Sequence, residues 1–417
     1  MEKKRVVITG LGALTPIGNN VSDYWSNLIK GVSGADYITR FDASLFKTQF
    51  ACEVKGFDPE SIMHRKEARK LDLFSIFAMA TAKEAMEDSN IDLENINLDR
   101  AGVIWGSGIG GLKTFQEECF NFKDGDGSPR FNPFFIPKMI VDIAAGHISM
   151  KYGLRGPNYV TVSACASSTN AMIDALMLIQ LGKSDIIVTG GSEAAVNIAG
   201  IGGFNALKAL STRNDSPKTA SRPFDSTRDG FVLGEGSGCL IMEELEHAKA
   251  RGAKIYAEVV GGGLTADAHH MTAPHPEGLG AINVMKMCLE DAGMKPEDID
   301  YVNVHGTSTP LGDIAETLAI KEVFKDHAPK LNISSTKSMT GHLLGAAGAI
   351  EAIACVKAVQ EDIIPPTINF EHEDENIDYS LNYTLNKAQK REVRAALSNT
   401  FGFGGHNTSV VIKKYNA

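Results

Sequence analysis

The sequence predicts an α/β fold built from two similar halves. Short apolar runs alternate with segments of helical periodicity along the 417 residues, which is typical of sheets covered by helices. The segments follow a similar order before and after residue 252, although direct sequence repetition is weak. In each series a reactive side chain, Cys165 or His305, stands at a strand-to-helix junction. We therefore expect a structural duplication, with fused halves at 1–252 and 253–417 that share an interface.

The elements of the first half follow from short β-branched runs and from apolar residues at helical spacing. Val6, Val7 and Ile8 begin a buried strand, and the segment 71–89 repeats apolar residues every three or four positions. By the same criteria strands are expected at 5–10, 101–107, 158–163, 185–191 and 238–243, and helices at 71–89, 137–151, 166–181 and, as a short charged helix, up to Arg251.

The second half repeats this alternation. Pro310 stands near the start of one expected helix, a position that helix openings favour. Strands are expected at 254–261, 300–304, 332–335, 394–400 and 408–414, and helices at 278–292, 310–325 and 345–359.

Composition narrows the class of protein. With 43% hydrophobic and 22% charged residues the chain can bury a large core, and a formal net charge of −10 argues against nucleic-acid binding. No apolar run is long enough to span a membrane, and the start of the chain is too short in apolar residues for a secretory signal. The six cysteines form no CxxC pair and no zinc spacing, so we expect reduced thiols in a cytoplasm and no disulfide framework, while a bound structural cation stays open.

Cys165 is the first candidate for chemistry. It follows a β-branched run and precedes a segment of helical periodicity, so it is expected near a helix N-terminus. Unpaired backbone N–H groups and the helix dipole favour a thiolate there. Taken alone, a buried inert cysteine is the better interpretation, because cysteine is among the most buried residue types.

Two histidines of the second half stand in comparable places. His305 ends a strand in the run HGTSTP, where Gly306 allows close approach of a ligand. His342 lies in the glycine-rich run that begins at Lys337, KSMTGHLLGAAG, with Glu351 in the helix that follows. The P-loop pattern is absent from this run, so phosphate binding is not expected. A capping histidine and a structural glycine-rich helix are the alternatives.

Near the C-terminus the run NTFGFGGHN, residues 399–407, connects two expected strands. Backbone N–H groups of such a glycine-rich turn can hold an oxyanion. A plain hairpin connection is equally consistent with this short motif.

Taken together, these motifs resemble those of the β-ketoacyl-[acyl-carrier-protein] synthases, the condensing enzymes of fatty-acid synthesis. The runs ACASS, HGTSTPLGD, KSMTGHLLGAAG and SNTFGFGGHN occur in the family's order, together with VVITGLGALTPIG and the STRND, SRPFD and RDGFVLGEG block. The resemblance covers essentially the whole chain. It implies a thiolase-like fold with αβαβα layers, and a decarboxylative condensation of acyl and malonyl groups carried on acyl carrier protein.

The resemblance also implies a role for each site residue. Cys165 is the nucleophile, and the N–H groups of Cys165 and Phe403 hold the oxyanion. His305 and His342 stabilise the enolate formed by decarboxylation, while Lys337 and Glu351 orient His342 and balance charge. Phe403 also resembles the family's gating aromatic. Further substrate contacts are expected from Thr307 and Thr309, which resemble hydroxyls that bind the phosphopantetheine arm, and from Ile109, Thr272, Phe401 and Glu351.

Partners follow from the same resemblance and from local charge. Basic residues gather before the helix at 71–89 and in a separate segment, and an acidic carrier protein would dock on them. The residues are Lys66, Arg69, Lys70 and Lys208. Family members are usually homodimers, with Ile109 and Phe134 expected near the shared surface. The resemblance implies no metal or redox cofactor, because the carrier's arm supplies the thioester.

Two other functions were weighed. A thiolase would need a second catalytic cysteine in the second half, and Cys288 and Cys355 are expected within helices instead. A non-catalytic partner subunit of a polyketide system would lack the nucleophile that this chain has, whereas the active partner of such a pair remains open. Ile109 favours a long-chain, type II enzyme. Two features, His406 and the pair His269–His270, depart from the common pattern near the entrance.

Overall fold

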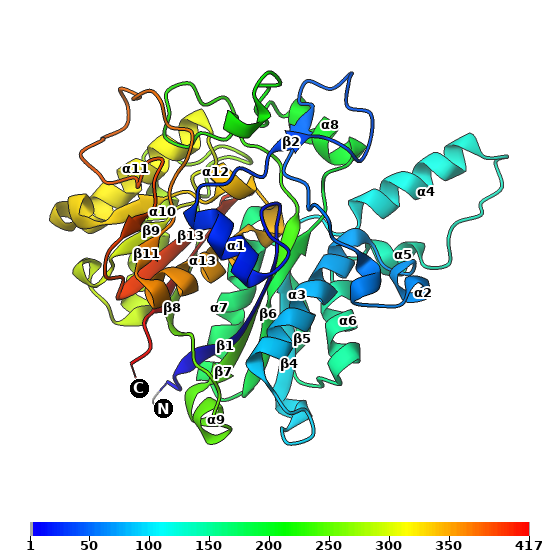
Figure 1. Ribbon diagram of the computed structural model, residues 1–417, viewed down its shortest axis with the longest axis horizontal. Helices are drawn as coiled ribbons and strands as arrows, with labels where there is room; N and C mark the ends of the chain where they lie inside the picture. The colour runs from blue at the N-terminus through cyan, green and yellow to red at the C-terminus, as the bar shows by residue number, and fades with distance from the viewer. Residues whose placement is uncertain (1–2, 417) are drawn as a thin grey trace.

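The computed structural model describes residues 3–416, and a ten-stranded sheet runs through it (Figure 1). Met1, Glu2 and Ala417, at the outer ends of the two expected halves, lie outside the described residues. The strands of the first half are β1 (Val6–Leu14), β4 (Ala101–Gly106), β5 (Asn158–Thr161), β6 (Ile186–Glu193) and β7 (Gly236–Glu244). Those of the second are β8 (Ala257–Ala266), β9 (Tyr301–Asn303), β10 (Asn332–Ser334), β13 (Ala395–Gly402) and β14 (His406–Lys413).

The two halves of the sheet have the same strand order. From the edge to the centre the first half runs β5-β4-β6-β7-β1, and the second runs β10-β9-β13-β14-β8. In both halves the three outer strands are parallel and the two inner ones antiparallel to their neighbours. β1 and β8 pair in the middle, with Val6 opposite Val259. The fold is the duplicated α/β fold that the sequence predicts, while the domain boundary at residue 252, between α9 (Leu245–Ala250) and β8, stays a prediction.

Helices α7 (Ser167–Gln180) and α13 (Ala347–Glu361) form the middle layer between the two halves of the sheet. A helix buried on most sides is apolar or small around most of its circumference, as α13 is apart from Glu351 and Lys357. The outer layers are α3 (Leu73–Ser89) with α6 (Ile143–Tyr152), and α10 (Leu279–Ala292) with α11 (Pro310–Phe324). This gives the five αβαβα layers.

The middle helices begin in the same unusual way. A residue with left-handed backbone, Ala164 (φ 51°) or Leu344 (φ 49°), starts a short 3₁₀ turn that leads into α7 or α13. Left-handed backbone is uncommon outside glycine and often marks a functional turn. The two 3₁₀ turns, Ala164–Ala166 and Leu344–Ala346, contact each other at the starts of α7 and α13.

Some expected elements differ in the structure. The helix expected at 137–151 is two helices, α5 (Phe135–Met139) and α6, because Ile140 between them has extended backbone (ψ 139°). The helix expected from residue 345 begins only at Ala347, after the 3₁₀ turn. Five α-helices were not foreseen: α1 (Val21–Ile29), α2 (Arg65–Ala68), α4 (Leu112–Asp124), α8 (Ile198–Ala206) and α12 (Lys337–Thr340).

Helix α4 and the segment after it project from the body as an arm (Figure 1). In the part of the chain that the structure describes, no helix has the length and apolar character needed to cross a membrane. The six cysteines, five of them buried, form no disulfide there.

Candidate active site

A cavity of about 430 Å³ lies where the two halves meet, and residues of both halves line it. The first half contributes Cys165 and Phe231, and the second contributes both candidate histidines. The sequence-predicted residues that line this cavity are Cys165, Lys208, Thr272, His305, Thr307, Thr309, His342, Phe401 and Phe403. Residues far apart in the sequence are therefore brought to one place.

Cys165 lies in the 3₁₀ turn before α7, as the sequence predicts. Gly402 packs against this turn, because a Cβ there would come within 2.7 Å of the Ser163 carbonyl oxygen and 3.1 Å of the Cys165 nitrogen. This approach brings the backbone of Phe403 beside the thiol. An oxyanion site formed by the Cys165 and Phe403 N–H groups is consistent with this arrangement.

The charge state of Cys165 differs from the sequence-based expectation. Burial raises the pKa of the Cys165 thiol to about 12, and the charge of Lys337 and the N–H groups of Phe403 and Cys165 only partly oppose it. The preference of a helix N-terminus for a thiolate is thus outweighed by desolvation of the buried sulfur. At neutral pH the Cys165 side chain is therefore a thiol.

His305 and His342 lie next to each other in the cavity. Their ring centroids are 5.3 Å apart with planes at 86°, and the rings of Phe401 and Phe231 pack at 5.5 Å and 5.2 Å against His305 and His342, respectively. Burial and the charge of Lys337 hold the pKa of both imidazoles well below the usual value. Both rings are neutral at neutral pH, so each can donate one N–H to an oxygen that becomes negative.

Lys337 and Glu351 form a buried ion pair behind the histidines. Lys337 begins α12 (Lys337–Thr340), and Glu351 lies in α13. Neither residue lines the cavity, so the substrate contact expected of Glu351 is corrected: its carboxylate is buried against Lys337. The pair acts on the site through the field of the ammonium group.

Thr307 and Thr309 point their hydroxyls at each other, with 3.1 Å between the oxygens, on the loop after β9. Two carboxylates of α11 hold this loop, and both were missed from the sequence. Glu316 accepts the N–H groups of His305 and Gly306 at 2.9 Å each, and Asp313 accepts that of Ser308 at 3.2 Å. Carboxylates in the first turns of a helix that directly follows the loop are the signal that could have found them.

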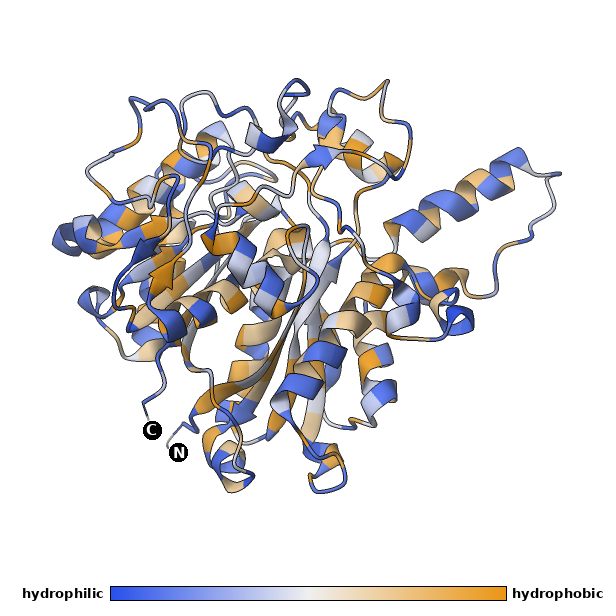
Figure 2. Cartoon of the chain, viewed as in Figure 1, coloured by the Kyte–Doolittle hydropathy of each residue, from blue (hydrophilic) through white to orange (hydrophobic). Residues whose placement is uncertain are grey.

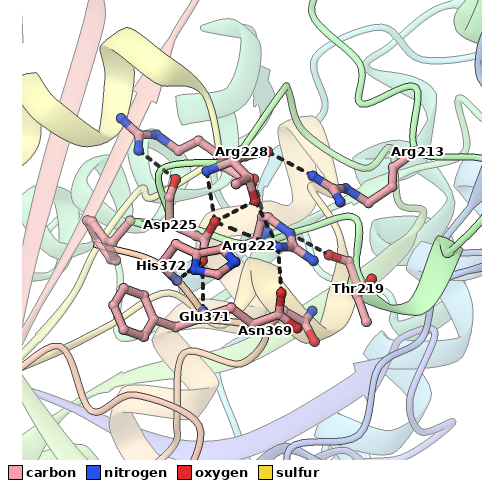
Figure 3. Close-up of polar contacts among 12 residues, drawn as sticks. Arg213, Thr219, Arg222, Asp225, Arg228, Asn369, Glu371 and His372 are labelled. Atoms are coloured by element: carbon pink, nitrogen blue, oxygen red, sulfur yellow. Dashed lines mark hydrogen bonds and ion pairs between the residues drawn. The ribbon is translucent and has the colours of Figure 1, made fainter. Parts of the chain in front are cut away.

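The SRPFD and RDG motifs hold the other side of the same loop, and Figure 3 shows the polar contacts around their Arg222, Asp225 and Arg228. The guanidinium of Arg228 is buried and donates to the carbonyl oxygens of Thr309 at 3.2 Å and Pro310 at 2.8 Å. Asp225, from the same turn, accepts the N–H groups of Glu371 and His372 at 2.7 Å each. These motifs thus fix the backbone that carries the two threonines.

The basic residues expected to dock a carrier lie in two places. Lys66 belongs to the short helix α2 (Arg65–Ala68), and Arg69 and Lys70 follow it; all three are exposed and outside the cavity wall. Lys70 lies 5.4 Å from the centre of the Phe134 ring. Lys208 lines the cavity itself.

The loop between β8 and α10 borders the same cavity. Its Asp267, Thr272 and His275 line the wall, and Asn407 of β14 donates to Asp267 at 2.8 Å. His269 packs on His275 of this wall with ring centroids 5.1 Å apart, whereas His269, His270 and His406 do not line the cavity themselves.

The alternative of a thiolase does not fit this site. Cys288 and Cys355 are buried within α10 and α13, and neither lines the cavity. The site instead combines one cysteine with two neutral histidines, which defines a thiolase-fold acyltransferase that forms carbon–carbon bonds.

Comparison with known proteins specifies the family. A family model described as "Beta-ketoacyl synthase, N-terminal domain" matches residues 3–248, and one described as "Beta-ketoacyl synthase, C-terminal domain" matches residues 256–371. The chain belongs to the beta-ketoacyl synthase family.

Individual relatives are similar over their whole length. The chain is 50% identical to proteins named 3-oxoacyl-[acyl-carrier-protein] synthase 2 from Synechocystis sp., covering 100% of this chain and 99% of that one, and from Coxiella burnetii, covering 99% of each. A β-ketoacyl synthase structure from Burkholderia phymatum is 35% identical with a TM-score of 0.92, over 99% of this chain and 100% of that one. A ketosynthase described in complex with its type II acyl-carrier protein is 33% identical with a TM-score of 0.90 over the same shares.

Proposed function

We propose that this chain condenses an acyl group with a malonyl group, both delivered by acyl carrier protein, in the elongation of fatty acids. The convergence of Cys165, His305 and His342 in one cavity at the junction of the halves carries this proposal. The names of the full-length relatives support it, because they are 3-oxoacyl-[acyl-carrier-protein] synthases.

In the first step Cys165 takes the acyl group. Its sulfur attacks the acyl thioester, the oxyanion lies against the N–H groups of Cys165 and Phe403, and the carrier leaves as a thiol with the proton of Cys165. Thr307 and Thr309 line the cavity, and in this proposal their hydroxyls bind the carrier's arm. The product of this step is an acyl-enzyme thioester.

In the second step the malonyl thioester loses its carboxylate as CO₂. The electron pair of the broken bond forms an enolate, and N–H groups of His305 and His342 stabilise its oxygen. The enolate carbon attacks the acyl carbonyl, the carbon–sulfur bond to Cys165 breaks, the thiolate takes a proton from solvent, and the 3-oxoacyl carrier is released. Every group in these steps comes from the substrates or the chain, so the proposal includes no metal or redox cofactor.

The test combines the reaction with histidine variants. Wild-type protein incubated with acyl carrier is expected to gain the acyl mass on the peptide that contains Cys165. His305→Ala and His342→Ala should each lower malonyl decarboxylation by about 10²–10³-fold, the usual effect of losing one donor to a developing oxyanion. Both variants should still acylate Cys165, which serves as the control. Full decarboxylation in either variant would contradict the assigned role.

Docking of the carrier predicts a charge dependence. Combined charge reversal at Lys66, Arg69 and Lys70 should raise the KM for carrier-bound substrate by about tenfold or more, because attraction to an acidic partner is lost. Transfer from a small pantetheine thioester should not change. Lys183→Glu, beyond the far end of α7 from Cys165, is the matched control. An unchanged KM in the triple variant would place the carrier elsewhere.

We also propose a homodimer, because the arm and the sheet edge expose apolar surface. The edge strand β5 and the residue after it expose Tyr159 and Val162, and the arm carries orange segments on its helix (Figure 2). The exposed arm residues are Phe115, Phe120, Phe122, Phe131, Phe134 and Ile136. Unpaired edges and apolar patches of this kind mark protein interfaces.

Sedimentation should therefore give twice the chain mass of 44.7 kDa. Phe120→Glu with Phe122→Glu should shift the protein to monomer, whereas Leu45→Glu, at an exposed apolar residue of another loop, should not. A monomeric wild-type protein at micromolar concentration would contradict the dimer. The cytoplasm is the proposed compartment, because the catalytic Cys165 has to stay a reduced thiol.

A further inference from the structure

Glu193 is a buried carboxylate that the proposed mechanism does not use. It ends β6, has no exposed surface, and forms no ion pair within residues 3–416. Hydrogen-bond donors surround it instead. Oε1 accepts from Ser107 Oγ and from the N–H groups of Ile109 and Gly110, each at 3.1 Å, and Oε2 accepts from the N–H groups of Gly108 at 2.7 Å and Gly345 at 3.1 Å.

These donors belong to two segments that are far apart in the sequence. The loop 107–110 follows β4, and Gly345 lies in the turn that leads into α13, three residues after His342. A Cβ at Gly345 would lie 2.2 Å from the Gly108 nitrogen and 2.7 Å from Oε2 of Glu193. The glycine at 345 is thus required by the approach of the two segments to the carboxylate.

The segments that Glu193 joins pack beside Cys165. Gly108 lies against the turn of the nucleophile, because a Cβ there would be 3.1 Å from the Ala164 carbonyl oxygen. Ile109 packs on a buried apolar cluster that contains Cys165, Ile201 and Leu344. The negative charge of Glu193 also acts on the thiol, because it is one of the causes that raise the pKa of Cys165. A long acyl chain on Cys165 would have to enter the apolar cluster, whereas an acetyl group would not.

A carboxylate is needed at this position because all of its partners are donors. A carboxylate offers two acceptor oxygens, while the amide of glutamine offers one oxygen and an NH₂ group that would face N–H donors. Glutamine would therefore leave buried N–H groups without an acceptor, and the loop 107–110 would have to move. The shape of the residue alone does not explain its presence.

We propose that Glu193 is a positioning residue that fixes the wall beside Cys165, through the loop carrying Ile109 and the turn after His342, and so sets the transfer of long acyl chains. This rests on the proposed function, in which Cys165 receives the acyl group. Glu193 touches neither substrate nor reacting atoms, so its effect should depend on the length of the acyl chain.

The experiment compares acylation of Cys165 by hexadecanoyl and acetyl carrier protein, followed by mass spectrometry. In Glu193→Gln the rate with the hexadecanoyl donor should fall at least about tenfold, and that with the acetyl donor less than about threefold, because a small displacement affects only the longer chain. Glu193→Asp keeps the acceptor oxygens and should recover part of the ratio. Glu243→Gln is the matched control: this carboxylate is also buried, at the opposite end of the same strand pair, and is held by Arg251 and His247.

Ser107→Ala keeps the test valid if Glu193→Gln does not fold, since it removes one donor to Glu193 and leaves the backbone intact. Its ratio of long-chain to acetyl transfer should fall about two- to fivefold. Equal losses for both donors, or an unchanged ratio in both variants, would overturn the proposal and leave Glu193 a structural residue. A wild-type protein that acylates Cys165 with neither donor would instead refute the proposed function.

Discussion

Replacing Cys165 by glutamine is expected to abolish condensation while malonyl decarboxylation continues. The variant has no sulfur to accept the acyl group, so formation of the 3-oxoacyl product should fall by at least about 10³-fold. The glutamine amide places an uncharged carbonyl beside the N–H of Phe403, where an acyl thioester would lie. His305 and His342 are unchanged, so CO₂ release from malonyl carrier should stay at or above the wild-type rate.

The measurement follows CO₂ and 3-oxoacyl product separately in the same reaction. Cys288→Ala is the control, because this thiol is buried within α10 and does not line the cavity. Loss of CO₂ release in the Cys165 variant would show that decarboxylation depends on the thiol, and would contradict the division of roles between cysteine and histidines.

Breaking the buried pair of Lys337 and Glu351 is expected to have the largest effect on stability. Lys337→Met leaves the Glu351 carboxylate buried without its partner, which typically lowers the free energy of unfolding by about 3–5 kcal/mol. Changing both residues, Lys337→Met with Glu351→Leu, should cost clearly less than the sum of the single changes, since no buried charge remains. Urea unfolding of Lys337→Met, Glu351→Leu and the double variant measures the three changes in the free energy of unfolding. A loss in the double variant equal to the sum of the two single losses would contradict the pairing.

The same substitution should change the pH dependence of decarboxylation. Lys337 is one of the groups that lower the pKa of His305 and His342. Without it both pKa values rise toward the ordinary value of about 6.5, so the rings become protonated at higher pH. The acidic limb of the decarboxylation profile should therefore move to higher pH in Lys337→Met. A profile that keeps its position would show that the charge of Lys337 does not affect the pKa of the two histidines.

The sequence was most informative where side chains themselves carry the chemistry. Cys165, His305 and His342 stand in motifs with glycines, small residues and a strand-to-helix change around them, and the cavity contains all three. The strands were foreseen because their β-branched and apolar runs are buried, as in β1 and β7. These signals are local, so a single sequence contains them.

What escaped the sequence acts through the backbone or at a distance. Glu193 and Glu316 bind N–H groups of loops, and a carboxylate in that role looks like any acidic residue until the loops are in place. The raised pKa of Cys165 arises from burial between two halves that are distant in the chain. Ile140 has extended backbone and interrupts a segment whose apolar spacing suits a helix. The spacing of side chains does not determine the backbone angles of one residue, so this break could not be predicted.

The repeat of the fold makes Cys165 and Gly345 equivalent positions, each following a left-handed residue at the entrance to a central helix. Two reactive centres could in principle have faced each other across the pseudo-twofold axis. The second is closed, since even a Cβ at Gly345 would collide with the Gly108 nitrogen at 2.2 Å. One of the two equivalent turns thus carries the thiol, and the other packs closely against the neighbouring loop, so the two halves contribute different parts to a single site.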